Sequence, residues 1–78
     1  MNARKKKVLE ALEFEERIRR AEIKRLELET FVREYRRKNR MSKGSRKLLE
    51  SGIQARKDRL KYVRKILKAI ALVKSEMR

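Results

Sequence analysis

The sequence predicts an all-α protein in which two long antiparallel helices form a coiled-coil-like helical hairpin. The chain of 78 residues contains no Pro and only two Gly, and it is rich in Leu, Glu, Lys, Arg and Ala, the residues that favour helices. In both halves apolar residues recur at alternating spacings of three and four, as in helices that pack lengthwise. A polar stretch near the middle separates the two patterns. We therefore expect a single helical-hairpin domain over residues 1–78.

The first helix is expected at about residues 3–38. Its clearest apolar row follows the heptad spacing with Arg25 as its one polar member, and such a row favours packing against another helix at a shallow angle. This row, called here the heptad seam, consists of Ala11, Phe14, Ile18, Ala21, Arg25, Leu28, Val32 and Tyr35. Phe14 and Tyr35 are accordingly expected in the core.

A second apolar set lies roughly opposite the heptad seam on the same helix. It consists of Val8, Leu12, Ile23 and Leu26. A helix that is apolar on two sides usually has two neighbours, so the hairpin is expected to dimerise or to pack into a larger assembly. Pairs of opposite charge four residues apart support the exposed faces: Glu13–Arg17, Glu15–Arg19, Glu16–Arg20 and Glu29–Arg33.

The connection between the helices is expected at about residues 39–45, with the sequence Asn-Arg-Met-Ser-Lys-Gly-Ser. Helix-forming residues thin out there, and Gly44 tolerates turn conformations. Ser42 or Ser45 is suited to cap the helix that follows, because a serine hydroxyl accepts a hydrogen bond from a free N–H of the first turn.

The second helix is expected at about residues 46–77. Gly52 weakens it, and we favour a continuous or slightly bent helix over a new start near Ile53. Its apolar face consists of Leu49, Ile53, Leu60, Val63, Leu67, Ile70 and Met77, widened by Ile66 and Val73.

The composition excludes most kinds of enzyme and metal site. The chain has no His and no Cys, hence no imidazole or thiolate ligand, no thiol nucleophile and no disulfide. Glutamates of the first helix come in pairs, but two helices rarely form the pocket that separates the pKa values of a catalytic pair. We expect a non-enzymatic protein with no catalytic, cofactor-binding or metal-binding residue.

The sequence predicts neither a membrane-spanning helix nor a secretory signal peptide. The longest apolar run, Ala69–Val73, is far shorter than the ~20 residues that a membrane-spanning helix needs. Acidic residues interrupt the segment after the basic start, which a secretory signal would not allow. The expectation is a soluble intracellular protein whose compartment stays open.

The charge balance predicts a polyanionic partner. The chain has 26 Lys and Arg against 11 Asp and Glu, a net charge of +15, which points to nucleic acid first and to an anionic membrane second. Five cations within roughly 100° of arc on the second helix suit a helix that lies along phosphates. This basic stripe consists of Lys57, Lys61, Arg64, Lys65 and Lys68. Its alternative interpretation is a merely solvated face.

A second basic cluster surrounds the connection between the helices. Arg is suited to bidentate phosphate contacts, and the segment from residue 36 to residue 47 holds no acidic residue. The residues of this basic elbow expected to bind nucleic acid are Arg36, Arg37, Arg40, Arg46 and Lys47. A flexible charged loop is the alternative.

Sequence-specific base reading is weakly indicated. Among the four aromatic residues, Tyr62, next to Lys61, is the one considered for stacking on an unpaired base. A helix-turn-helix around residues 48–67 would place Asp58 and Lys61 at core positions, which argues against it. The basic start, Arg4–Lys7, fits a nucleic-acid-binding tail, a frayed terminus or a localisation signal.

Residues 59–65, Arg-Leu-Lys-Tyr-Val-Arg-Lys, somewhat resemble the small two-helix protein of the large ribosomal subunit, as do the length and the expected hairpin. The continuation, Ile66–Ile70, departs from the small-residue, Arg and Thr pattern of that family. The resemblance is therefore an analogy, and we infer no membership from it.

Together these features predict a structural component of an RNA–protein particle such as a ribosome, bound through the phosphate backbone. RNA is favoured over DNA by association, since small basic helical chains without a base-reading motif are typical of such particles. The alternatives are a helical subunit of a capsid, scaffold or multi-subunit complex, a DNA-binding helical protein, and an amphipathic helix on a membrane surface. The last is disfavoured because the hairpin core needs the same apolar face.

Overall fold

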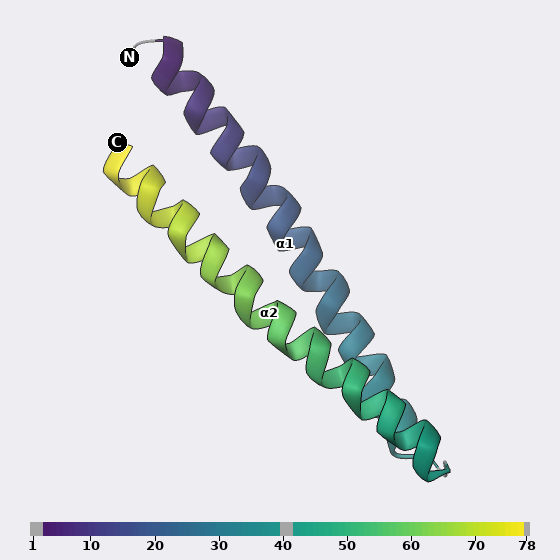
Figure 1. Ribbon diagram of the computed structural model, residues 1–78. Coiled ribbons are helices and arrows are strands. Elements are labelled where there is room, and N and C mark those ends of the chain that lie inside the picture. The colour runs from purple at the N-terminus through teal and green to yellow at the C-terminus, as the bar shows by residue number, and fades with distance from the viewer. Residues whose placement is uncertain (1–2, 40–41, 78) are drawn as a thin grey trace.

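The computed structural model describes residues 3–39 and 42–77, which form two antiparallel helices side by side (Figure 1). Helix α1 spans Ala3–Arg37 and helix α2 spans Lys43–Met77, each of 35 residues. The two helices pack along their lengths into a rod of 60 × 14 × 13 Å, with the first residues of α1 and the last residues of α2 at the same end of the rod. The predicted all-α helical hairpin is confirmed.

Short-range hydrogen bonds end one helix and begin the next. The N–H of Lys38 donates to the carbonyl of Tyr35 at 3.2 Å, a three-residue bond that tightens the last turn of α1. Ser42 is the N-cap of α2, because its Oγ accepts from the N–H of Ser45 at 3.3 Å. The helix therefore begins at Lys43, three residues before the expected start. It continues through Gly52 without a break, as favoured from the sequence.

The apolar face of α2 packs as its pattern indicates. Ile53, Leu60, Val63 and Ile70 are buried, and Val63 is fully enclosed. The other positions of the expected face are half-buried, except Val73, which is 41% exposed and does not widen the core.

The face that α1 turns toward α2 is not the heptad seam, and this part of the prediction is wrong. Leu26 and Thr30 are the buried residues of α1, and Ile23 packs against Leu26 and its partners on α2. Phe14 and Tyr35, expected in the core, are 57% and 63% exposed. The contact face instead derives from the second apolar set, through Leu12, Ile23 and Leu26, whereas Val8 is 42% exposed. Helix α1 is thus turned by roughly half a turn from the expected orientation.

Charges on both helices explain this orientation. Arg56 and Arg59 of α2 reach Glu29 and Glu22 of α1 at 3.3 and 2.9 Å. On the other flank of the contact, Lys57 reaches Glu34 at 3.1 Å and Arg64 reaches Glu27 at 3.0 Å. Lys74 reaches Glu16 at 3.2 Å near the chain ends.

If the heptad seam faced α2 instead, one flank of the contact would consist of Glu10, Arg17, Lys24 and Phe31. The cations of α2 would then meet cations on that side. A single exposed ion pair contributes only about 0–1 kcal/mol, but the observed orientation places glutamates on both flanks of the contact, whereas the alternative would place Arg17 and Lys24 on one of them. The balance of charge therefore selects the less apolar face of α1 for the contact.

Candidate nucleic-acid interface

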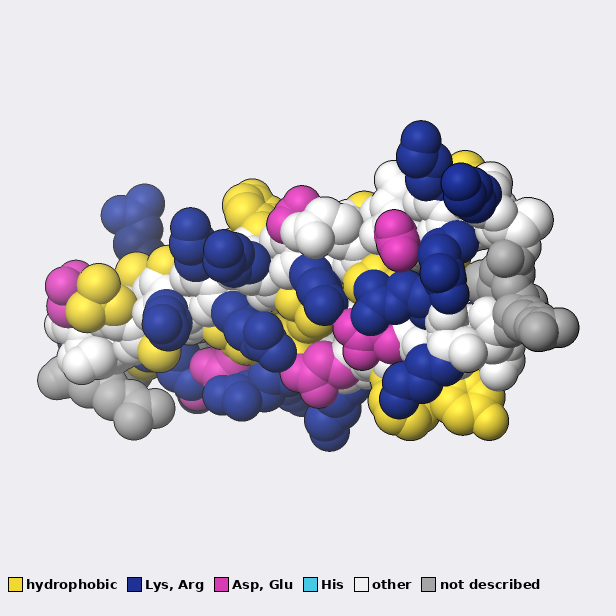
Figure 2. All heavy atoms as spheres, turned by 90° about the horizontal axis from the view of Figure 1, so that it is seen from below, with side chains coloured by type: hydrophobic (Ala, Val, Ile, Leu, Met, Phe, Trp, Pro, Cys, Tyr) yellow, Lys and Arg dark blue, Asp and Glu magenta, His cyan; other side chains and the backbone are white. Residues whose placement is uncertain are grey.

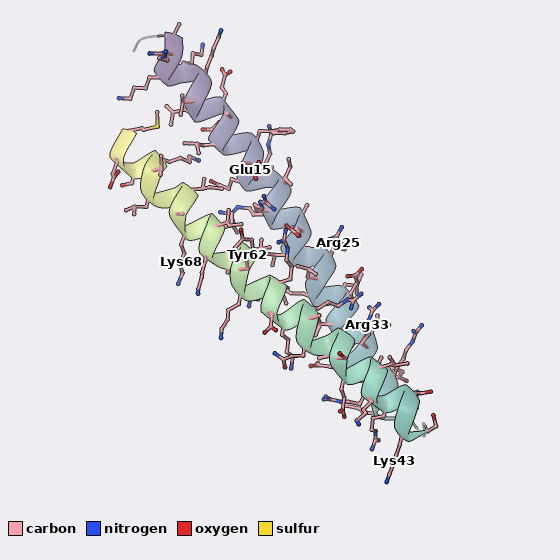
Figure 3. The ribbon with its side chains drawn as sticks, in the orientation of Figure 1. Glu15, Arg25, Arg33, Lys43, Tyr62 and Lys68 are labelled. Atoms are coloured by element: carbon pink, nitrogen blue, oxygen red, sulfur yellow. The ribbon has the colours of Figure 1, made fainter. Side chains whose placement is uncertain are left out.

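Three lysines of the basic stripe lie free on the outer face of α2. Lys61, Lys65 and Lys68 are exposed and form no ion pair within the described part of the chain. They lie at spacings of four and three, so they follow one line over roughly 10 Å of helix axis. Figure 3 shows Lys68 pointing away from α1. The three ammonium groups are therefore available to an anion that approaches α2 from outside.

The other two members of the stripe bind acidic residues of α1. Lys57 lies 3.1 Å from Glu34, and its side chain is 51% exposed. Arg64 donates to Glu27 at 3.0 Å, with 56% and 53% of the two side chains exposed. Such exposed pairs are weak and easily exchanged. The basic stripe thus has two parts. Lys61, Lys65 and Lys68 form a free row, whereas Lys57 and Arg64 form ion pairs with α1.

The basic elbow remains a cluster of cations without carboxylate partners among residues 36–39 and 42–47. Arg36, Arg46 and Lys47 are exposed and Arg37 is half-buried. Arg46 donates to the backbone carbonyl of Arg37 at 3.4 Å, which draws the two arms of the elbow together. Arg40, also predicted here, lies outside the described residues.

The two basic regions are separate on the surface of α2. Glu50 and Asp58 lie between the elbow and Lys61 along the chain, and Asp58 accepts a hydrogen bond from Gln54 at 2.9 Å. Figure 2 shows Lys and Arg side chains along the whole rod, with acidic side chains among them. A polyanion would therefore meet two positive regions rather than one continuous band.

Two acidic residues of α1, Glu16 and Glu22, are held in their charged form by hydrogen bonds from neighbouring cations. Hydrogen bonds from Lys74 and then Arg20 hold the pKa of Glu16 below its ordinary value of 4.5. Hydrogen bonds from Arg59 and Arg19 lower the pKa of Glu22 in the same way and outweigh the opposing effect of burial. The hydrogen bond to Glu22 in turn raises the pKa of Arg19. These carboxylates neutralise cations at the helix contact and leave the outer face of α2 positive.

All four aromatic rings are exposed by more than half. Besides Phe14 and Tyr35, Phe31 is 66% and Tyr62 is 55% exposed. The guanidinium of Arg59 lies over the ring of Tyr62, 5.2 Å from its centre, so one face of that ring is covered. Stacking of Tyr62 on an unpaired base remains a prediction.

Sequence reasoning missed the residues that join the two helices. Arg56, Arg59 and Lys74 each bind a glutamate of α1, and none of the three was singled out. A signal was available: in an antiparallel hairpin with a short connection, partner positions lie at equal distances from the turn, and each of these cations has a glutamate near that position.

Comparison with known proteins finds no significant match among family models, curated proteins or solved structures. The analogy to the ribosomal two-helix protein thus gains no support. Within residues 3–39 and 42–77, no three acidic side chains come together as a metal site would require, and no helix is long and apolar enough to cross a bilayer.

Proposed function

We propose that this protein binds nucleic acid through the phosphate backbone, as a non-enzymatic structural component of an RNA–protein particle. The observation that carries the proposal is the row of Lys61, Lys65 and Lys68, exposed on α2 without acidic partners among residues 3–39 and 42–77. Ammonium groups on a rigid helix attract phosphates without reading sequence. The preference for RNA over DNA rests only on the association described above.

The basic elbow adds a second region for phosphates at the tip of the rod. Its guanidinium groups, from Arg36, Arg37 and Arg46, lack carboxylate partners in the described structure and suit bidentate contacts to phosphate oxygens. On a rod 60 Å long, a positive tip of this kind suits a groove or cavity lined by phosphates.

The test is binding of the nuclease-treated protein to generic RNA and DNA duplexes across a series of salt concentrations. Three phosphate contacts on a DNA duplex would give a log–log slope of about −3, and additional contacts at the elbow would make the slope steeper. A preference for one polymer would decide between RNA and DNA. Absence of binding, or affinity that does not depend on salt, would contradict the proposal.

Paired variants localise the contact. The double variant K61E/K65E is expected to weaken binding at least tenfold and to leave the helicity unchanged, because both side chains point into solvent. The matched control K6E/K7E makes the same change in net charge on exposed residues at the far end of α1. An equal loss in both variants would show that Lys61 and Lys65 are not the specific contact, since total charge or the basic start would account for the binding equally well.

A helical subunit of a protein assembly is the second candidate function. The observation that favours it is the exposed heptad seam of α1, which includes Leu28 at 64% and Tyr35 at 63% exposure. A stable complex with other proteins and no retained nucleic acid would support this alternative over the first.

A further inference from the structure

The outer face of α1 is an apolar strip without a neighbour in the hairpin. Phe14, Ile18, Leu28, Val32 and Tyr35 are between 38% and 64% exposed on it. Monomeric proteins rarely expose a continuous apolar patch beyond a few hundred Å². From Ala11 to Tyr35 this strip extends over ~36 Å of helix at ~1.5 Å per residue. We infer that the heptad seam of α1 binds the heptad seam of a second copy of this chain, in a parallel two-stranded coiled coil. This inference does not depend on the proposed binding of nucleic acid.

The spacing of the seam identifies another helix as the occupant. From Ala11 to Tyr35 every step alternates between three and four residues, a regularity that keeps a narrow stripe facing a helix that coils around it. Ala21 leaves a shallow hollow of about 380 Å³, lined also by Ile18, Glu22 and Arg25. Hollows of this kind receive the side chains of a facing helix. A globular groove or a membrane surface would not require this strict repeat.

The residue types within the seam favour two parallel strands. In heptad notation Ala11, Ile18, Arg25 and Val32 occupy the a positions, and Phe14, Ala21, Leu28 and Tyr35 occupy the d positions. Branched residues at a with Leu at d favour parallel dimers, as Ile18, Val32 and Leu28 provide. A single polar residue at a, here Arg25, fixes register and strand number at a cost in stability. Figure 3 shows Arg25 pointing away from α2, toward the side where the second copy would lie.

Flanking charges match only when the two helices run parallel. In that arrangement Arg17 faces Glu22 of the second copy and Lys24 faces Glu29 of the second copy. Antiparallel helices would place these glutamates opposite glutamates and the cations opposite cations. One parallel pair, Glu10 with Glu15, is repulsive. Charge complementarity at the centre of the seam therefore selects the parallel arrangement.

The geometry of the hairpin leaves room for the second copy. Glu22 and Glu29 already accept hydrogen bonds from Arg59 and Arg56 of α2 at 2.9 and 3.3 Å. They lie between the two faces of α1, and a carboxylate has enough lone pairs to accept from a second cation. Since the seam lies nearly opposite the contact with α2, two hairpins can join through α1 with both α2 helices outside.

The molar mass of the purified protein tests the inference, measured by sedimentation equilibrium from 1 to 200 μM. The expected result is twice the chain mass of 9.5 kDa at the upper concentrations. The double variant I18D/L28D is expected to remain a helical monomer throughout, because both side chains are exposed on the hairpin. A native chain that stays monomeric, or that forms a species larger than a dimer, would overturn the inference.

A matched variant and a cross-link make the test specific. L48D/L72D alters two leucines of α2 that are 77% and 62% exposed, and it is expected to dimerise like the native chain. The protein has no Cys, so A11C introduces a single thiol at the seam. In a parallel dimer the two thiols are adjacent and oxidation links nearly all chains. If only a mixture of A11C and Y35C cross-links, the helices are antiparallel and the parallel arrangement is wrong.

Discussion

The face of α1 that packs on α2 is less apolar than the face that is exposed to solvent, although apolar content alone would predict the reverse. The face packed on α2 includes Glu16, Arg19 and Arg33 beside its apolar residues, whereas the outer heptad seam has one polar member, Arg25. The inner face nevertheless forms the hairpin, because glutamates flank it on both sides and meet the cations of α2. In a contact between only two helices, the flanking charges thus outweigh apolar content in deciding which face of α1 packs on α2.

Leucine-to-alanine changes on the two faces give the largest expected difference. L26A removes a side chain that is 5% exposed, and it should lower the free energy of unfolding by about 2–3 kcal/mol through lost burial and a cavity. L28A removes one that is 64% exposed, and it should change the stability of the isolated hairpin by less than about 0.5 kcal/mol. Urea unfolding followed by circular dichroism at 1 μM measures both. Equal losses would show that the faces are wrongly assigned.

A smaller difference in stability between the two faces of α1 is expected when Thr30 on the inner face is changed to Val and Val32 on the outer face is changed to Thr. The Oγ of Thr30 is buried and has no hydrogen-bond partner among the described residues, so T30V should stabilise the hairpin by about 1 kcal/mol. The control V32T makes the reverse change on the outer face, where Val32 is 38% exposed. Its effect on the hairpin should be near zero. Thermal unfolding of both variants is the measurement, and a destabilised T30V would indicate that the hydroxyl is hydrogen-bonded.

The smallest expected effect concerns pH. The pKa of Glu22 lies below its ordinary value of 4.5 in the folded chain, so its contribution to stability is complete above about pH 4.5. That contribution is lost as the pH falls through the lower pKa of the folded state. E22Q should therefore be less stable than the native chain at pH 7, and this difference should vanish toward pH 2.

The control for pH is E10Q, since Glu10 is exposed and joins no ion pair in the described structure. Its stability should follow that of the native chain at every pH in urea titrations. A difference for E22Q that persists at pH 2 would mean that packing, rather than charge, accounts for the role of Glu22.

The sequence was sufficient for the hairpin and for the contact face of α2, because α2 has one apolar face and a break of polar residues precedes it. The apolar pattern alone was insufficient for α1, which has two apolar faces. Choosing between them requires the register of Arg56 and Arg59 against Glu29 and Glu22, a property of the pair of helices that neither pattern contains alone. The same limit applies to the basic stripe, where Lys57 and Arg64 have partners on α1.

The contacts between the helices become progressively more distant in sequence from the elbow to the chain ends. Arg46 and Arg37 are 9 residues apart, Arg56 and Glu29 are 27 apart, and Lys74 and Glu16 are 58 apart. Closing a loop costs more entropy as it lengthens, so contacts form most readily at the elbow and then extend toward the ends. Pairing of the two helices should thus begin at the basic elbow, where cations are concentrated, and proceed toward the ends of the rod. Counterions that screen the elbow would then speed folding itself, and the paired ends would be the first part to open.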